Sequence, residues 1–136
     1  MASRLGNAAY TVGWVCVDHI NLATARAMLE EEHGSPQEQA HLDDNSYILG
    51  RIRLYNIAIA CVPAGERGIV SASVTASEMI LSFPEIRFGV LVGTGGGIPS
   101  NNHDIQLGDV AVSIPDQIFG GVVQFDLGKA TLTGFV

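Results

Sequence analysis

Three nearly continuous apolar runs, separated by segments of helical periodicity, constrain the fold of this chain more than any other feature. The runs are YTVGWVCV (10–17), the second half of SYILGRIRLYNIAIACV (46–62) and IRFGVLVG (86–93). Runs this rich in β-branched and aromatic residues are typical of strands, and the last one is apolar on both faces, as in a strand covered by helices on each side. Strands that alternate with helices predict an α/β fold with a mixed central sheet flanked by helices.

Two helices are predicted between these strands. The first runs from Ile20 to about Glu32 and is ended by a Gly and a Pro at 34 and 36. The second follows a loop at 63–68 and stops at Pro84, because proline cannot continue a helix. Residues 46–62 are expected to form two short strands or a hairpin. Two further strands are expected at 108–114 and 120–126.

Composition narrows the class of protein. The 136 residues, 47% of them hydrophobic, predict a single domain over 1–136 with ample material for a core. A net charge of −7 without any basic run makes a nucleic-acid partner unexpected. No leader pattern and no run long enough to cross a bilayer is visible, so a soluble, cytoplasmic protein without a membrane partner is expected. Cys16 and Cys61 are interpreted as buried reduced thiols, and the four histidines show no metal-ligand spacing.

A glycine-rich turn follows the third apolar run, with four glycines among the five residues 93–97. The dinucleotide fingerprint G-x-G-x-x-G would need a further glycine at Ile98 or Ser100, and a Walker loop is absent because Gly128-Lys129 is followed by Ala130. The turn stands where ligands bind in open α/β sheets, and its bare backbone N–H groups could approach an anion or a polar ligand edge. A tight strand connection without a ligand is the alternative interpretation.

A second glycine loop, VPAGERGIVSAS (62–73), places Gly65 and Gly68 just before the second helix. The first turn of a helix leaves N–H groups unpaired, so this loop could receive an anion or a sugar oxygen. Arg67 could add a full positive charge, although a solvated loop arginine is the simpler interpretation. Both loops follow apolar strands of consecutive α/β units, and together they suggest one pocket.

The order of these motifs resembles the N-terminal part of the nucleoside phosphorylase and nucleosidase family. The resemblance runs from about Tyr10 to Lys129 through YTVGWVCV, YILGRI, IACVPAGERGIVSASVTASEM and FPEIRFGVLVGTGGGIPSNNHDIQLGDVAVS. It is strongest toward fungal versions that stand in receptor-like chains. The resemblance implies cleavage of the N-glycosidic bond of a purine or pyrimidine nucleoside, with phosphate as a possible co-substrate and no other cofactor.

Residue by residue, the resemblance assigns substrate binding to two segments. The loop with Gly65, Arg67 and Gly68 matches the family's segment near the nucleophile and ribose. The segment Thr94, Gly95 and Gly96 matches the phosphate or water side of the pocket. Asp109 matches a recurrent aspartate that is interpreted as structural, at the start of its strand.

Departures from the family pattern favour weak or absent catalysis. Asn21 stands where nucleosidases carry a glutamate base, and an amide cannot take a proton from water. Leu91 stands where uridine-phosphorylase-like members place a phosphate-binding arginine. The chain is also expected to be the truncated first half of such a domain, with apolar sheet faces or unpaired edges that favour a homo-oligomer. A non-catalytic nucleoside- or nucleotide-sensing module of a fungal receptor-like protein is the alternative function, and a structural remnant is the third.

Overall fold

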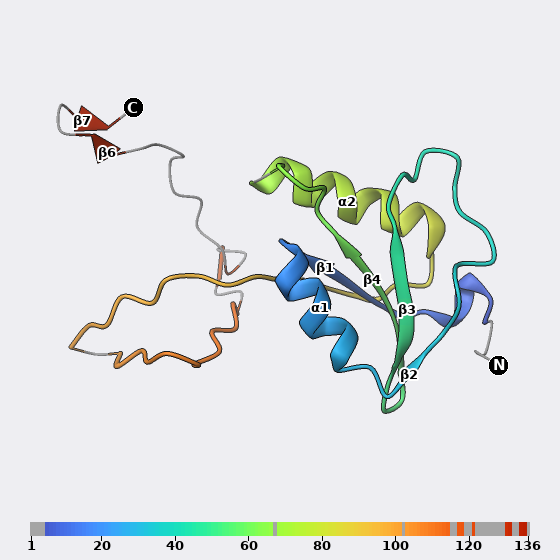
Figure 1. Cartoon of the computed structure of the whole chain (residues 1–136), viewed down its shortest axis with the longest axis horizontal. Helices are drawn as coiled ribbons and strands as arrows, with labels where there is room; N and C mark the ends of the chain where they lie inside the picture. The colour runs from blue at the N-terminus through green and yellow to red at the C-terminus, as the bar shows by residue number, and fades with distance from the viewer. Residues whose placement is uncertain are drawn as a thin grey trace. The chain divides into compact units, whose positions relative to one another are not determined.

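The computed structural model describes residues 5–66, 68–101, 103–114, 117–118, 121, 130–131 and 134–135 (Figure 1). The chain divides into two units, Met1–Gly95 and Gly96–Val136. Every long strand and both α-helices belong to the first unit.

A five-stranded mixed sheet forms the centre of the first unit. The strand order is β2-β3-β4-β1-β5, in which the central β1 is parallel to both β4 and β5, while β2, β3 and β4 pair antiparallel. The predicted α/β fold with a mixed central sheet is therefore confirmed. The strands are β1 (Val12–Cys16), β2 (Glu31–Glu32), β3 (Tyr47–Ile52), β4 (Tyr55–Cys61) and β5 (Phe88–Val92).

The segment 46–62 forms the expected hairpin. β3 and β4 pair from Tyr47 with Ala60 to Ile52 with Tyr55, and Arg53 in the connecting turn has a φ of 53°. A positive φ is uncommon for a residue with a side chain and is confined to tight turns of this kind. The hairpin places β4 beside β1 and leaves β3 to carry β2 on its outer side.

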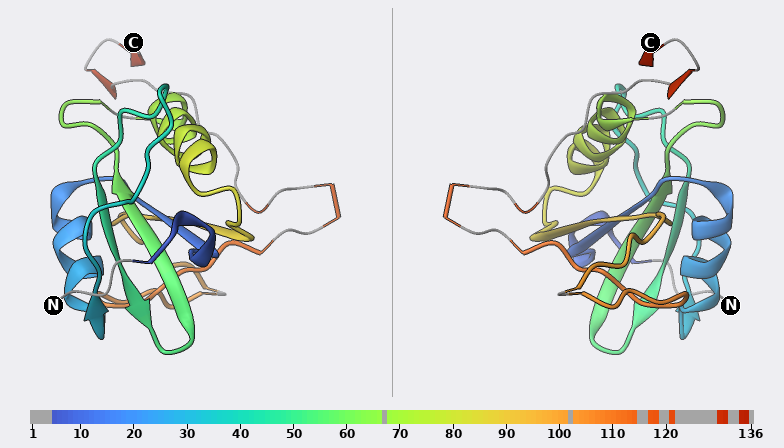
Figure 2. Two further views of the ribbon diagram at one scale, coloured as in Figure 1. Left: turned by 90° about the vertical axis from the view of Figure 1, so that its right-hand side faces the viewer. Right: turned by 90° about the vertical axis from the view of Figure 1, so that its left-hand side faces the viewer.

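Two helices cover opposite faces of this sheet (Figure 2). α1 (His19–Ala27) follows β1, α2 (Ile69–Ser82) follows β4, and a 3₁₀ turn, η1 (Asn7–Ala9), precedes β1. Because side chains alternate along a strand, each strand supplies both layers of the core. The layer under α2 contains Tyr10, Leu49, Met79 and Phe83, and the layer under α1 contains Cys16, Ala25, Ile57 and Ile59.

α1 is shorter than the helical periodicity predicts. It ends at Ala27 with Met28 as its C-cap, and Glu31–Glu32 form β2 instead of a last helical turn. Leu29 explains the difference, because it packs so closely on Gly50 of β3 that a Cβ there would lie 2.5 Å from its Cδ1. This packing, together with pairing of the backbone to β3, outweighs the local helical preference.

β5 differs from its prediction as a strand covered on both faces. It is the edge strand next to β1, and Phe88 and Leu91 are 67% and 61% exposed. The two helices pack over β1 and β4, so a strand that is apolar on both faces lies at an open edge. The expected unpaired edge with apolar residues is therefore present in this unit.

The second unit corrects two predictions. No strand forms over 108–114; instead, Gln106–Asp109 make a turn in which the Asp109 carboxylate accepts the Gln106 N–H at 2.9 Å. Asp109 has a structural role, but it closes a turn and starts no strand, because Gly108 takes a φ of 97° just before it. The strand expected at 120–126 lies outside the described residues except for Gly121. A short hairpin of β6 (Ala130–Thr131) and β7 (Gly134–Phe135) was not predicted.

Candidate functional site

The parallel strands β4, β1 and β5 end at one edge of the sheet. Hydrogen bonds continue past the strands there, since Val62 N–H donates to the Cys16 carbonyl at 2.9 Å and Val17 N–H donates to the Val92 carbonyl at 3.1 Å. Both glycine loops therefore leave the sheet at its carboxyl edge, on either side of the connection from β1 to α1. This is the edge at which open α/β sheets bind ligands.

The loop after β4 leads to a helix without a side-chain cap. Gly65 and Gly68 have φ values of 89° and 96°, which residues other than glycine rarely adopt. Gly68 is the N-cap of α2 and has no side chain to accept the first N–H groups of the helix. Within the described part of the chain no side chain caps these groups, so they can meet an anion or a ligand oxygen. Arg67, the cation predicted for this loop, lies outside the described residues.

The glycines of the turn after β5 differ in their surroundings: one is in close contact with a neighbouring segment, and two have open space beside them. A Cβ on Gly93 would lie 2.6 Å from Val17 Cγ2, so Gly93 is required by the close contact with the chain leaving β1. A Cβ on Gly95 or Gly96 would meet no atom within 4 Å. Thr94 and Gly95 end the first unit, and Gly96 opens the second. A ligand could therefore approach the backbone at Gly95 without meeting a side chain.

Between the two loops, α1 begins with a charged cap. The Asp18 carboxylate accepts the Asn21 N–H at 2.8 Å, and this backbone hydrogen bond is the main cause of the lowered pKa of Asp18. A carboxylate held in this way is a weak base, and its charge offsets the positive end of the α1 dipole. An anion would therefore find α2 a better helix terminus than α1.

Asn21 places a buried side-chain amide at the start of α1. Its side chain is 8% exposed, and its Nδ2 makes no hydrogen bond of ordinary geometry within the described part of the chain, although the amide lies close enough to Asp18 to help lower the pKa of that carboxyl. Buried amide groups are normally paired with protein, water or ligand. Asn21 can donate to an oxygen at this edge, but it cannot serve as the general base of a hydrolase.

The two thiols at the same edge are unsuited to nucleophilic chemistry. Cys16 and Cys61 are free and lie opposite each other in the β1–β4 pair. Burial is the main cause that raises the pKa of Cys16 to about 11, and burial also raises the pKa of Cys61. Both thiols are protonated at neutral pH and behave as small apolar groups. Among the described residues, no group of three or more His, Cys, Asp or Glu is placed to hold a metal ion.

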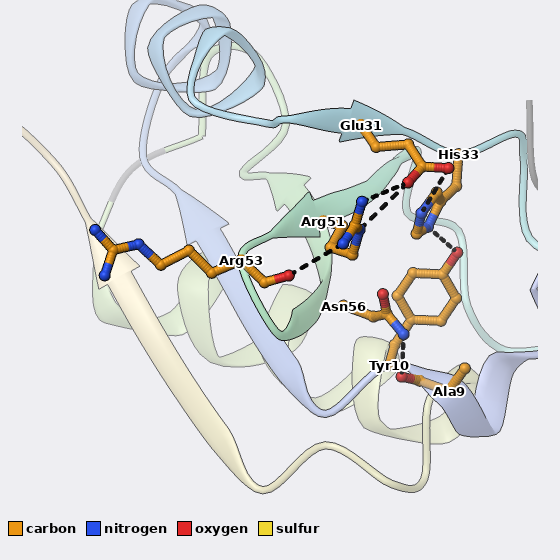
Figure 3. Close-up of polar contacts among 7 residues, drawn as sticks. All are labelled: Ala9, Tyr10, Glu31, His33, Arg51, Arg53 and Asn56. Carbon is orange, nitrogen blue, oxygen red and sulfur yellow. Dashed lines mark hydrogen bonds and ion pairs between the residues drawn. The ribbon is translucent and has the colours of Figure 1, made fainter.

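A polar cluster at the opposite, amino edge of the sheet is structural (Figure 3). The hydroxyl of Tyr10 lies 2.9 Å from Nδ1 of the buried His33, whose Nε2 lies 4.0 Å from Glu31. Glu31 in turn forms an ion pair with Arg51 at 3.0 Å, and Asn56 Nδ2 donates to the Ala9 carbonyl. Since each side chain has a protein partner, this cluster fastens the ends of β1, β2 and β4 together.

Two hollows in the described part of the surface lie away from the predicted loops. A groove of about 470 Å³ runs along the outward side of α2, and a hollow of about 310 Å³ lies beside Asn7 and Pro84. Neither is lined by Gly65 or by Thr94–Gly96.

Sequence reasoning missed the α2 groove and the capping role of Asp18. The Asp residue three positions before Asn21, at the start of an apolar periodic segment, was the available signal for the cap.

No helix among the described residues has both the length and the apolar content to cross a bilayer. Comparison with known proteins gives one informative relative. The chain is 46% identical over 126 residues to a nucleotide-binding leucine-rich repeat (NLR)-like protein of the fungus Hyaloscypha variabilis. The match covers 93% of this chain but 12% of that protein, so the chain corresponds to a small part of it. No family model matches the sequence, and no solved structure matches it.

Proposed function

We propose that this chain is a non-catalytic nucleoside-sensing module of a fungal receptor-like protein. The observation that carries the proposal is the 46% identity, over 93% of the chain, to an NLR-like protein of a fungus. Receptor-like chains need a module that binds and releases a ligand, and turnover of the ligand would remove the signal. The sensor role therefore fits this relative better than the role of a metabolic enzyme.

A nucleoside is the proposed ligand class because the motif order of the sequence resembles that of nucleoside phosphorylases and nucleosidases. The carboxyl edge of β4, β1 and β5 supplies three features that suit a nucleoside. The uncapped N-terminus of α2 can meet a ribose oxygen or phosphate, the open backbone at Gly95 can meet a second polar edge, and Asn21 Nδ2 can donate to an oxygen. Members of the family that the sequence resembles cleave the N-glycosidic bond, and we propose that this chain binds a nucleoside without cleaving it.

The words "nucleotide-binding" in the relative's name carry no part of this proposal. They describe a protein of which the chain matches 12%, and they do not say which part binds the nucleotide. The chain itself lacks the pattern G-x-x-x-x-G-K-[ST] that cradles the phosphates of a nucleoside triphosphate. A nucleoside without a triphosphate is therefore the proposed ligand, with inorganic phosphate as a possible second one.

Calorimetric titration of the purified chain with adenosine, inosine, uridine and phosphate tests the proposal. Weak binding of at least one nucleoside is expected, and Gly95→Val should weaken it at least about tenfold by blocking the approach to the backbone. The variant should fold, because a side chain at Gly95 meets no atom within 4 Å. Gly89→Val is the matched control, since Gly89 also has open space but lies within β5.

Two results would contradict the sensing role. The first is a wild-type chain that binds none of these compounds at millimolar concentration. The second is equal binding by the wild type and by Gly95→Val, which would remove the ligand from this edge of the sheet.

The absence of turnover is a separate prediction. We expect no measurable release of base from adenosine, inosine, uridine or methylthioadenosine, with or without phosphate. Asn21 cannot accept a proton, and Asp18 is held as a helix cap with a lowered pKa, so neither residue activates water. Loss of a positioned base alone costs about 10²- to 10⁴-fold in rate. Base release above a control without protein, and lost in Gly95→Val, would restore the enzyme interpretation.

A further inference from the structure

The outward face of α2 is apolar along its whole length. Five large apolar side chains on this face are between 50% and 77% exposed, and two small exposed serines, Ser73 and Ser77, lie among them. A surface helix normally turns charged residues to solvent, and a helix that is apolar all round is normally covered. The five are Ile69, Val70, Val74, Ile80 and Leu81.

α1 provides the contrast within the same unit. Its exposed side carries His19, Thr24 and Arg26, and Arg26 forms an ion pair with Glu32 at 2.8 Å. α2 has one charged residue in 14, the half-buried Glu78. The two helices thus cover opposite faces of one sheet, but α1 exposes one large apolar residue, Ile20, whereas α2 exposes five.

The shape of the face suits another helix. Val70, Val74, Ser77 and Leu81 are spaced by four, three and four residues, which is the seam spacing of paired helices. A shallow, open hollow of about 470 Å³ is lined by these four residues and their neighbours on α2. Its small serines, one turn apart, leave room for a second helix at the usual interaxial distance.

The face is also symmetric about the middle of the helix. Reversed about the midpoint between Thr75 and Ala76, the seam maps onto itself, with Val70 opposite Leu81 and Val74 opposite Ser77. Large residues meet at both ends of the seam, and each Val74 meets the small Ser77 of the other helix in the centre. A twofold interface brings one patch against a copy of itself, so it requires this kind of self-complementarity.

We propose that α2 is a dimer interface, paired antiparallel with α2 of a second copy of this chain. Charge agrees with this occupant, because the antiparallel register places Glu78 opposite Ser73 and not opposite the other Glu78. It disagrees with a membrane surface, because interfacial helices carry Lys or Arg beside their apolar face and α2 carries none. The proposal is independent of nucleoside binding.

The area is sufficient for a specific dimer. The five large side chains expose on the order of 500 Å² of apolar surface per copy, a patch size that is often functional in monomers. Two such faces bury about 1,000 Å² in total, which reaches the lower range of specific interfaces. A reversible dimer with a micromolar dissociation constant is the expected strength.

Sedimentation equilibrium of the full chain tests the interface. The wild type should form dimers at high micromolar concentration, and Val74→Glu should raise the dimer dissociation constant at least about 100-fold, because a twofold interface contains the buried charge twice. Leu54→Glu is the matched control, since Leu54 is 92% exposed in the β3–β4 turn, far from α2 in the sheet. Circular dichroism of all three proteins checks that each remains folded.

The register has its own test. A mixture of the Val74→Cys and Ser77→Cys chains, oxidised by air with a copper catalyst, should give more cross-linked dimer than either chain alone. A wild type that stays monomeric would overturn the proposal, as would dimers that survive Val74→Glu. The second result would move the interface elsewhere, for example to the open edge of β5. Equal cross-linking in all three samples would overturn the antiparallel arrangement.

Discussion

Replacing Phe83 with alanine should lower the free energy of unfolding of the first unit by about 3–5 kcal/mol. Phe83 is fully buried at the end of α2, and its ring packs edge-on against Tyr10 and Tyr47 at centroid distances of 5.5 and 4.9 Å. Truncation removes the ring and leaves a cavity between the helix and the sheet. Since a domain is stable by about 5–15 kcal/mol, this single change would leave little stability.

Urea unfolding followed by the fluorescence of Trp14, the single tryptophan, measures this effect. Phe88→Ala is the control, because Phe88 is 67% exposed on β5 and should cost less than about 1 kcal/mol. A small effect at Phe83 would show that the aromatic cluster does not hold α2 on the sheet. A large effect at Phe88 would show that the open edge of β5 is covered in solution.

The first unit was predictable from sequence because its signals are local. The apolar runs of β1 and β4, the periodicity of α2 and the stop at Pro84 each act within a few residues. The end of α1 was not predictable in this way, because it depends on Leu29 packing on Gly50, about 20 residues later in the chain. The exposure of β5 depends on strand order, which no local pattern encodes.

The candidate site was predictable in its position but not in its details. Glycines after β4 and β5 pointed to the carboxyl edge, where both loops lie. The separate roles of Gly93, which packs on Val17, and Gly95, which is open, depend on the contact across β1 and β5. The burial of the Asn21 amide likewise depends on packing in three dimensions. The apolar face of α2 was readable as periodicity, but whether it faced the core or solvent was not.

The long connection between β2 and β3 is fastened by a buried carboxylate that composition does not reveal. Asp43 is 5% exposed, and its oxygens accept hydrogen bonds from the Tyr47 hydroxyl at 2.7 Å, from the Asn45 N–H at 3.0 Å and from the Ser82 hydroxyl. Ser82 ends α2 and also accepts the Ala40 N–H at 2.9 Å. One side chain therefore ties the connection to β3 and to the end of the helix.

Asp43→Ala should destabilise the first unit by about 3–5 kcal/mol, because one buried and two partly buried donors lose their acceptor at once and each costs about 1–3 kcal/mol. Asp43→Asn should cost less, since one amide oxygen can still accept from Tyr47 or Ser82, while the amide nitrogen opposes the remaining donors. Urea unfolding measures both variants. Asp44→Ala, the same change at an exposed neighbour, should stay within about 0.5 kcal/mol of the wild type. If Asp43→Ala and Asp44→Ala were equally stable, the hydrogen bonds of the Asp43 carboxylate would add no net stability. The connection would then be held by its backbone contacts alone.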